Sequence, residues 1–185
     1  MKNYVRCKVC GFIMEESDLK DVCPACGVPK TAFVEHKFTI KEKRLQLLSL
    51  HLHPISVHFP EAIAVFLVGF LLLSFITPDY MSNNLLIVNK VLSIFFPLTV
   101  LLAFVAGVYD AKIRFKKLSP PYLKMKIYLG IGLFLGSLIM PFLYVFSSDT
   151  LTMKFLILII SIINLLLCVR LGKMGGKLID SVMPG

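Results

Sequence analysis

The sequence predicts an α-helical membrane protein, a four-transmembrane-helix bundle that carries a small metal-knuckle domain at its N-terminus. Two observations predict this fold class. Four cysteines form two CxxC pairs near the start of the chain. Hydrophobic residues make up 57% of the chain, and its mean hydropathy is +0.81. Because this excess is concentrated after residue 54, we expect a metal-binding domain over 1–37, a basic juxtamembrane linker over 38–53 and a transmembrane domain over 54–185.

The two CxxC pairs predict a site for a single metal ion. Each pair places two thiolates on one tight turn. A glycine follows each pair, and because glycine has no Cβ we expect it to let the amides of the turn point toward sulfur. Four thiolates suit either iron or zinc, and their spacing does not separate the two metals. A domain of about 37 residues buries little apolar surface, so the metal is expected to supply much of its folding free energy. The expected ligands are Cys7, Cys10, Cys23 and Cys26.

The segments CKVCGF and CPACGVPKTAF resemble rubredoxin, and most closely the short rubredoxin-like domain of rubrerythrin. The resemblance covers about residues 4–35. It implies that the four cysteines hold one iron ion that carries single electrons, with zinc as the alternative. Only Tyr4, Phe12 and Phe33 offer aromatic cover for the metal. We therefore expect an exposed site, and its exposure would affect the reduction potential.

After residue 54 the chain contains four apolar runs that are long enough to cross a bilayer. The connections between them are short, so sequential helices are expected to be antiparallel neighbours in an up-down-up-down arrangement. The expected spans are about 55–76, 85–108, 126–146 and 153–171.

The distribution of lysine and arginine predicts the orientation of these helices. Basic residues are concentrated in 1–54, in 109–126 and after the fourth helix, whereas 77–84 and 147–152 contain none. By the positive-inside rule both termini face the cytoplasm, and the protein is expected in the cytoplasmic (inner) membrane. The net charge of +9 is then explained by the membrane topology, with anionic lipid as the expected partner, and no nucleic-acid partner is expected. Residues 38–50 are expected to form either a short interfacial helix or a solvated linker.

The segment HLHPISVHFPE, residues 51–61, contains three of the four histidines at the start of the first span. Pro54 is expected at the first helical position. His53, His58 and Glu61 are candidates for a cofactor pocket that holds haem b or a quinone, because ionisable residues at membrane depth are commonly functional. The alternative is that they are interfacial residues solvated by headgroup water.

Several other polar residues and glycines are expected at this same cytoplasmic side of the bundle. They come from the ends of the second, third and fourth spans, so together with the histidines of the first span they predict a shared polar region there. They are Tyr109, Asp110, Tyr122, Lys124, Lys126, Gly175 and Gly176.

The segments HPISVHFPEAIAVF, AGVYDAK and GKMGGKLIDSVMPG resemble an uncharacterised family of four-helix membrane proteins with HP and VHFP motifs and a C-terminal Gly-Gly motif. The resemblance covers residues 53–185. In that family a further histidine usually stands near the start of the third helix, where this chain has YLKMKIYLG. This departure argues against a haem with two histidine ligands.

The sequence therefore predicts a membrane-anchored rubredoxin-type electron carrier. It would pass single electrons between a cytosolic redox protein and a haem or quinone pocket, either alone or as a homo-oligomer. The alternative is a zinc-ribbon protein that docks a partner at the membrane without redox chemistry. A stand-alone enzyme is less favoured: a di-iron site needs several inward glutamates and ExxH pairs, and Glu61 is the only glutamate after residue 54. Cys168 is expected to be a packing residue.

Overall fold

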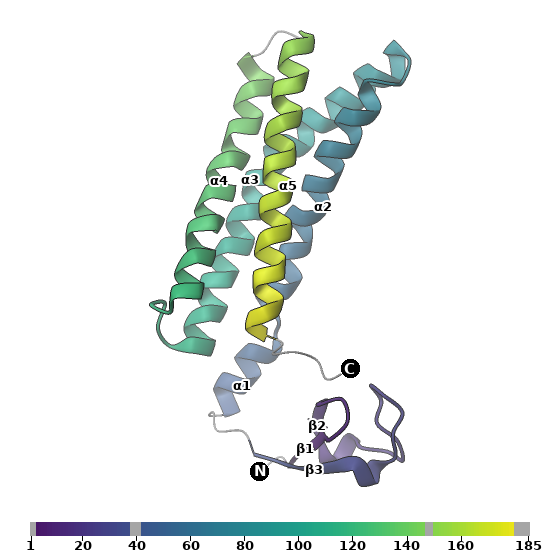
Figure 1. The fold of residues 1–185 in the computed structure, drawn as a ribbon, viewed down its shortest axis with the longest axis vertical. Coiled ribbons are helices and arrows are strands. Elements are labelled where there is room, and N and C mark those ends of the chain that lie inside the picture. The colour runs from purple at the N-terminus through teal and green to yellow at the C-terminus, as the bar shows by residue number, and fades with distance from the viewer. Residues whose placement is uncertain (1–2, 38–41, 147–149, 180–185) are drawn as a thin grey trace. The chain divides into compact units, whose positions relative to one another are not determined.

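A computed structural model of the chain describes residues 3–37, 42–146 and 150–179. The chain divides into two compact units, of which the first contains the N-terminal residues up to Leu45 and the second is Gln46–Gly176. Figure 1 shows that the first unit contains a small sheet and that the second consists of long helices.

The N-terminal unit is built on a three-stranded antiparallel sheet with the order β2-β1-β3. In the central strand, Val5 and Cys7 are buried while Arg6 between them is exposed. This alternation is the period of two that a strand imposes on its side chains. Cys7, the last residue of β1, therefore has its side chain in the interior of the N-terminal unit. The strands are β1 (Tyr4–Cys7), β2 (Ile13–Glu15) and β3 (Phe33–His36), with short 3-10 helices η1 (Glu16–Asp18) and η2 (Lys30–Ala32).

A short helix, α1 (Glu42–Ser49), precedes the first long helix, α2 (Leu52–Ser74). Of the two alternatives for 38–50, the structure shows a short helix over Glu42–Ser49, and 38–41 lie outside the described residues. His51 separates the two helices with φ of 49°, in the left-handed region, and its Nδ1 lies 2.6 Å from the Ser49 carbonyl oxygen. Whether α1 lies in a membrane interface stays a prediction.

Four helices are long and apolar enough to span a membrane, and the mean hydropathies of their most apolar windows lie between 1.9 and 2.5. The prediction of four apolar helices is confirmed, but the helices extend beyond the predicted apolar runs. Polar residues continue the helices at their ends, which hydropathy alone does not detect. Pro54 is accordingly the third helical residue rather than the first. The other helices are α3 (Asp79–Phe115), α4 (Pro121–Phe146) and α5 (Leu151–Ile179).

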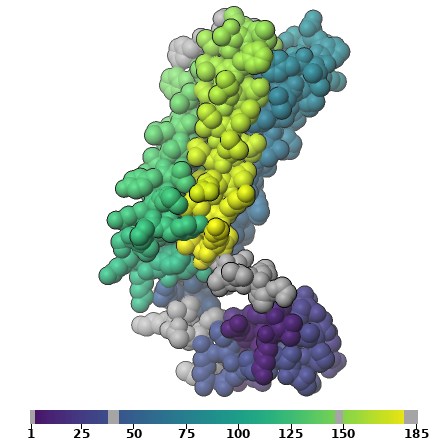
Figure 2. Space-filling view, in the orientation of Figure 1, coloured from purple at the N-terminus to yellow at the C-terminus, as the bar shows by residue number. Residues whose placement is uncertain are grey.

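The four long helices share one apolar core, with the closest pairing between α2 and α3. Figure 2 shows α5 in yellow running along the bundle beside α4 in green. The core residues come from every helix: Ala64, Leu67 and Leu71 from α2, Phe96 and Val100 from α3, Leu133 and Met140 from α4, and Ile157 and Cys168 from α5.

Most of the apolar surface of these helices faces outward. Only 22–28% of the residues in each apolar window are buried, and large side chains such as Leu102, Phe142 and Leu166 are more than 60% exposed. Apolar patches of this extent are not found on soluble monomers. A hydrocarbon environment removes the cost of exposing them, so the surface is consistent with a multi-pass membrane protein.

The interior of the bundle also holds polar side chains. Asn89 is fully buried and donates from Nδ2 to the Leu67 carbonyl oxygen at 2.8 Å, which ties α3 to α2. Asn164 on α5 is 1% exposed and packs against Gly136 on α4, where an added Cβ would meet its Oδ1. Small residues that let helices approach, together with buried polar side chains, are typical of helix contacts inside membranes.

Replacing Gly136 by alanine should destabilise the membrane domain by about 1–3 kcal/mol, because the new Cβ collides with a buried amide that has little freedom to move. Thermal unfolding of the detergent-solubilised protein measures the effect. Gly132→Ala is the matched control, since a Cβ there meets nothing within 4 Å. Equal stability of the two variants would contradict the packing of Asn164 described above.

Candidate metal centre

The four predicted cysteine ligands converge in the structure. The sulfur atoms of Cys7, Cys10, Cys23 and Cys26 all lie within 4.8 Å of one another. Two of the separations, Cys7–Cys26 and Cys10–Cys23, are 3.8 Å. A metal–sulfur bond of about 2.3 Å gives a tetrahedron with sulfur–sulfur edges of about 3.8 Å. The donor set therefore fits one tetrahedral metal ion, iron or zinc, and the sulfurs are too far apart for a disulfide.

Two turns of the same construction carry these sulfurs. In the first, the Cys7 amide donates to the Phe12 carbonyl oxygen at 2.8 Å and the Gly11 amide donates to the Cys7 carbonyl oxygen at 3.0 Å. The second turn repeats both hydrogen bonds sixteen residues later, as Cys23 to Val28 at 2.8 Å and Gly27 to Cys23 at 2.9 Å. The sequence repeat C-x-x-C-G thus produces a repeat in backbone geometry.

The glycines of these turns are needed for their backbone conformation. Gly11 has φ of +77° and Gly27 has φ of +75°, values that residues with a Cβ rarely adopt. A Cβ added at either position would meet nothing within 4 Å. The expectation that a Cβ would obstruct the amides is therefore wrong, and positive φ is the reason for glycine.

The amides of the turns also act on the sulfurs. The backbone amide of Cys10 donates to the Cys7 thiol and lowers its pKa to about 7, although desolvation opposes this shift. At Cys26 the Val28 amide also lowers the pKa, but desolvation and the three neighbouring sulfurs outweigh it and raise the pKa to about 12. Four thiolates therefore share this space only when a cation compensates their charge. Metal binding releases thiol protons, so affinity falls as the pH is lowered.

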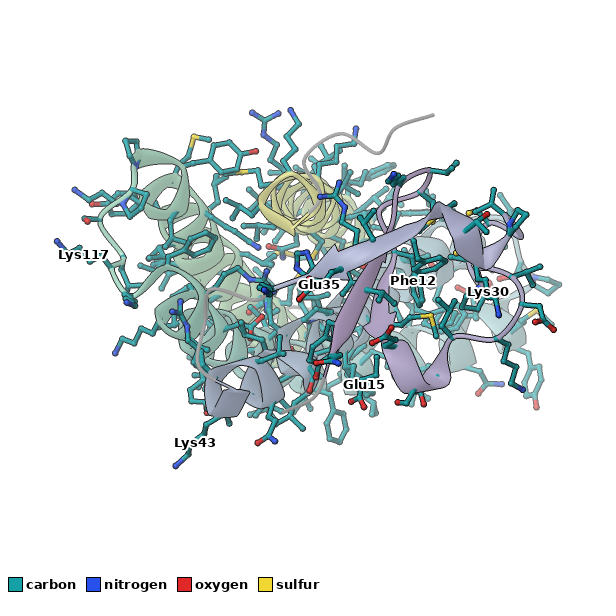
Figure 3. The ribbon with its side chains drawn as sticks, turned by 90° about the horizontal axis from the view of Figure 1, so that it is seen from below. Phe12, Glu15, Lys30, Glu35, Lys43 and Lys117 are labelled. Atoms are coloured by element: carbon teal, nitrogen blue, oxygen red, sulfur yellow. The ribbon has the colours of Figure 1, made fainter. Side chains whose placement is uncertain are left out.

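One edge of the centre is open to solvent. Cys7 is 0% and Cys23 is 1% exposed, whereas Cys10 is half-buried and Cys26 is exposed. Phe12, which lies between β1 and β2 (Figure 3), is itself 40% exposed. The expectation of an exposed metal site thus agrees with the structure.

In the membrane domain, His53 has partners at both ring nitrogens. Its Nδ1 lies 3.1 Å from the Ala103 carbonyl oxygen of α3, and its Nε2 lies 3.4 Å from Nζ of Lys126 on α4. A haem iron would have to displace one of these partners. A haem or quinone at this end of the bundle therefore has no support from the described contacts and stays a prediction.

The other two candidate residues on α2 lie apart from His53. His58 is exposed, and within the described part of the chain no contact joins it to His53 or Glu61. Glu61 is half-buried and faces α5, with Oε1 3.1 Å from the position of a Cβ at Gly172.

Two residues near His53 were expected at this end of the bundle but were not among the candidate site residues. Lys126 contacts the His53 ring, and Asp110 is 8% exposed and interacts electrostatically with both. Lys126 and Asp110 are both charged residues next to an apolar run, and this feature of the sequence could have identified them as candidates. Lys124 is exposed, as are Tyr109 and Gly176, so only part of the predicted polar region converges.

Residues 6–34 match the family model of the rubredoxin-like domain of rubrerythrin. Among curated proteins and among solved structures, nothing matches the chain. The N-terminal domain is therefore rubredoxin-like, as the cysteine segments indicated. The resemblance of residues 53–185 to a four-helix membrane family is not confirmed by the family match and stays a prediction.

Replacing Cys7 or Cys23 by serine should abolish metal binding and unfold the N-terminal domain. Each side chain belongs to the four-sulfur site and is also buried in the interior of the domain. Metal content per chain and proteolysis of the domain measure the two effects. Cys168→Ser should keep a full metal equivalent, since Cys168 lies in the core of the helices. A full equivalent in Cys7→Ser and Cys23→Ser would refute the ligand assignment.

Replacing Gly27 by alanine should destabilise the metal-bound domain by about 1–2 kcal/mol, the cost of a left-handed conformation for a residue with a Cβ. Gly27→Asn should cost less, because asparagine tolerates this conformation. Thermal melting followed by loss of the metal distinguishes the two variants. If alanine and asparagine cost the same, φ is not the reason for this glycine.

Proposed function

We propose that the protein is a membrane-anchored electron carrier of the rubredoxin type. Its four-cysteine iron would alternate between ferric and ferrous states, so that one electron is taken up and released without breaking a bond. The observation that carries this proposal is the set of four sulfurs at tetrahedral spacing, with Cys10 and Cys26 at an edge open to solvent. Electron transfer needs close approach of a partner, and an exposed ligand edge allows it.

The proposed partner is a cytosolic redox protein, which follows from the proposed topology. Basic residues are dense before α2, between Lys112 and Lys126, and near the end of α5, and they are absent from 77–84. This distribution supports a cytoplasmic position for the N-terminal domain and for the connection between α3 and α4. Thiols stay reduced in the cytosol, which suits a thiolate metal site.

For the membrane-side electron acceptor we favour a quinone over a haem. Axial ligation of haem requires a free imidazole nitrogen beside a pocket, whereas both nitrogens of His53 have protein partners and His58 lies exposed on α2. A quinone dissolved in the bilayer needs no protein ligand to its reacting atoms.

A second candidate function is a zinc-ribbon anchor that docks a protein partner at the membrane. The same sulfur tetrahedron supports it, because four thiolates at this spacing suit zinc equally well. Zinc is redox-inactive, so the two functions differ in whether the centre accepts an electron.

Anaerobic reductive titration of the purified protein distinguishes them. The oxidised protein should show the visible charge-transfer bands of ferric thiolate, and these should bleach with one electron per chain and return on reoxidation. Cys168→Ser should behave as the wild type. A colourless protein with one zinc per chain and no electron uptake would refute the electron-carrier proposal and favour the anchor.

The topology is tested by labelling introduced cysteines with a membrane-impermeant maleimide. Tyr80→Cys, in the exposed first turn of α3, should label from outside intact cells, because 77–84 lacks basic residues. Ser119→Cys, exposed between α3 and α4, should label only after permeabilisation. The reverse pattern would place the metal domain outside the cell and contradict a cytosolic partner.

A further inference from the structure

The four sulfurs of the metal centre differ in their access to solvent. Cys7 and Cys23 are buried, Cys10 is half-buried and Cys26 is exposed. The residues on either side of Cys26 are an alanine and a glycine, and all of 24–27 is exposed. Of the five cysteines, all of which the structure describes, Cys26 is therefore the one most open to a reagent in solution.

Each of the two outer sulfurs lies beside a buried sulfur of the other turn. Sγ of Cys26 is 3.8 Å from Sγ of Cys7, and Sγ of Cys10 is 3.8 Å from Sγ of Cys23. A disulfide needs a sulfur–sulfur distance of about 2.05 Å, so either pair has to close by roughly 2 Å to form one. A bound metal ion holds the sulfurs apart, so a disulfide can form only as the ion leaves.

Metal binding keeps each of the four cysteines in the thiolate form, which is the nucleophilic form of cysteine. Thiolate character and exposure together decide which cysteine a peroxide oxidises. The four ligands share the first property, and exposure then selects Cys26. Oxidation of Cys26 gives a sulfenic acid, which condenses with a neighbouring thiol to a disulfide. The neighbour in the other turn is Cys7.

We propose that Cys26 is a site of oxidation by hydrogen peroxide and that Cys7 resolves the oxidised sulfur, so that the metal ion is released and a disulfide joins the two turns in its place. The proposal concerns the sulfurs, and it holds for an iron and for a zinc centre alike. It goes beyond electron transfer and does not depend on it, because a centre that carries no electrons would still be oxidised at Cys26.

Two steps convert the thiolates into the disulfide. The Cys26 thiolate attacks one oxygen of the peroxide, so that an S–O bond forms, the O–O bond breaks, and hydroxide leaves as water after taking up a proton from solvent. The Cys7 thiolate then attacks the Cys26 sulfur, so that the S–S bond forms, the S–O bond breaks, and a second hydroxide leaves as water with a second solvent proton. The two sulfurs lose two electrons in total, and one peroxide gains them.

The disulfide would couple peroxide to the state of the whole domain. Cys7 and Cys26 lie 19 positions apart in different turns, so the bond joins the same two turns that a metal ion joins. It removes two of the four ligands, and the two remaining sulfurs are a poor site for a metal that prefers four. Because thiols reduce disulfides, the four-cysteine site can form again when the peroxide has been consumed.

Zinc-loaded full-length protein in detergent tests the proposal without a redox-active metal. One equivalent of hydrogen peroxide should release one zinc per chain, measured with a chromogenic chelator. The remaining thiols are then blocked, and the protein is digested with trypsin, which cleaves after Lys8 and so separates Cys7 from Cys10. Fragment masses of the joined peptides distinguish the expected bond to Cys26 from a bond to Cys23.

Variants that keep four zinc ligands test the order of attack. Cys26→His retains a site of three cysteines and one histidine, a common zinc site. The imidazole forms no sulfenic acid, so zinc release should slow about tenfold or more. Cys10→His is the matched variant, because it replaces the half-buried ligand and keeps Cys26 and Cys7, and it should slow the release less. Cys168→Ser, in the core of the helices, should leave the rate and the disulfide unchanged.

The wild-type protein decides the proposal even where a histidine variant fails to bind zinc. Retention of zinc in the presence of peroxide, a disulfide within one turn, or a bond from Cys7 to a sulfur other than that of Cys26 would overturn it. Equal rates of zinc release from the wild type and from zinc-loaded Cys26→His would overturn it as well.

Discussion

The N-terminal domain depends on the convergence of four sulfur atoms on one ion. Among residues 3–37 only Val5, Cys7 and Cys23 are buried, so two of its three core residues are themselves ligands. Its strands are three or four residues long, and such a sheet does not hold together without further contacts. A metal ion bound to these sulfurs would take the place of an apolar core, and the same ion would supply the proposed redox chemistry. Stability and function of this domain are therefore one property.

The domain of long helices differs from the N-terminal domain in having far more apolar side chains than its interior holds. Most of its large apolar side chains point outward around a small apolar core, and several close contacts between its helices are polar or involve glycine, as with Asn89, Asn164 and Gly136. Where lipid is as apolar as the helices, burial of apolar surface no longer drives association, and close packing and interhelical hydrogen bonds take its place. The contact between His53 and Lys126 extends this pattern to ionisable groups.

The sequence predicted the four cysteines that converge and the four long apolar helices because both signals are local. Cysteine spacing identifies a metal turn, and an apolar run identifies a span. It did not predict the small sheet, whose strands are only three or four residues long, or the helix ends, where polar residues continue the hydrogen bonding. The contact between His53 and Lys126 joins residues 73 positions apart and depends on the rotation of two helices about their axes. Because three histidines lie within 51–61, the sequence made His58 as strong a candidate as His53, but His58 is exposed in the structure.

X-ray absorption at the metal edge of the purified protein tests the central claim, a redox-active iron held by these four cysteines, most directly. The spectrum should show an iron edge with four sulfur neighbours and no nitrogen or oxygen neighbours. On reduction the edge should shift to lower energy while the sulfur coordination is retained. A zinc edge without iron, or an iron with nitrogen or oxygen neighbours, would contradict a redox-active iron held by these four cysteines.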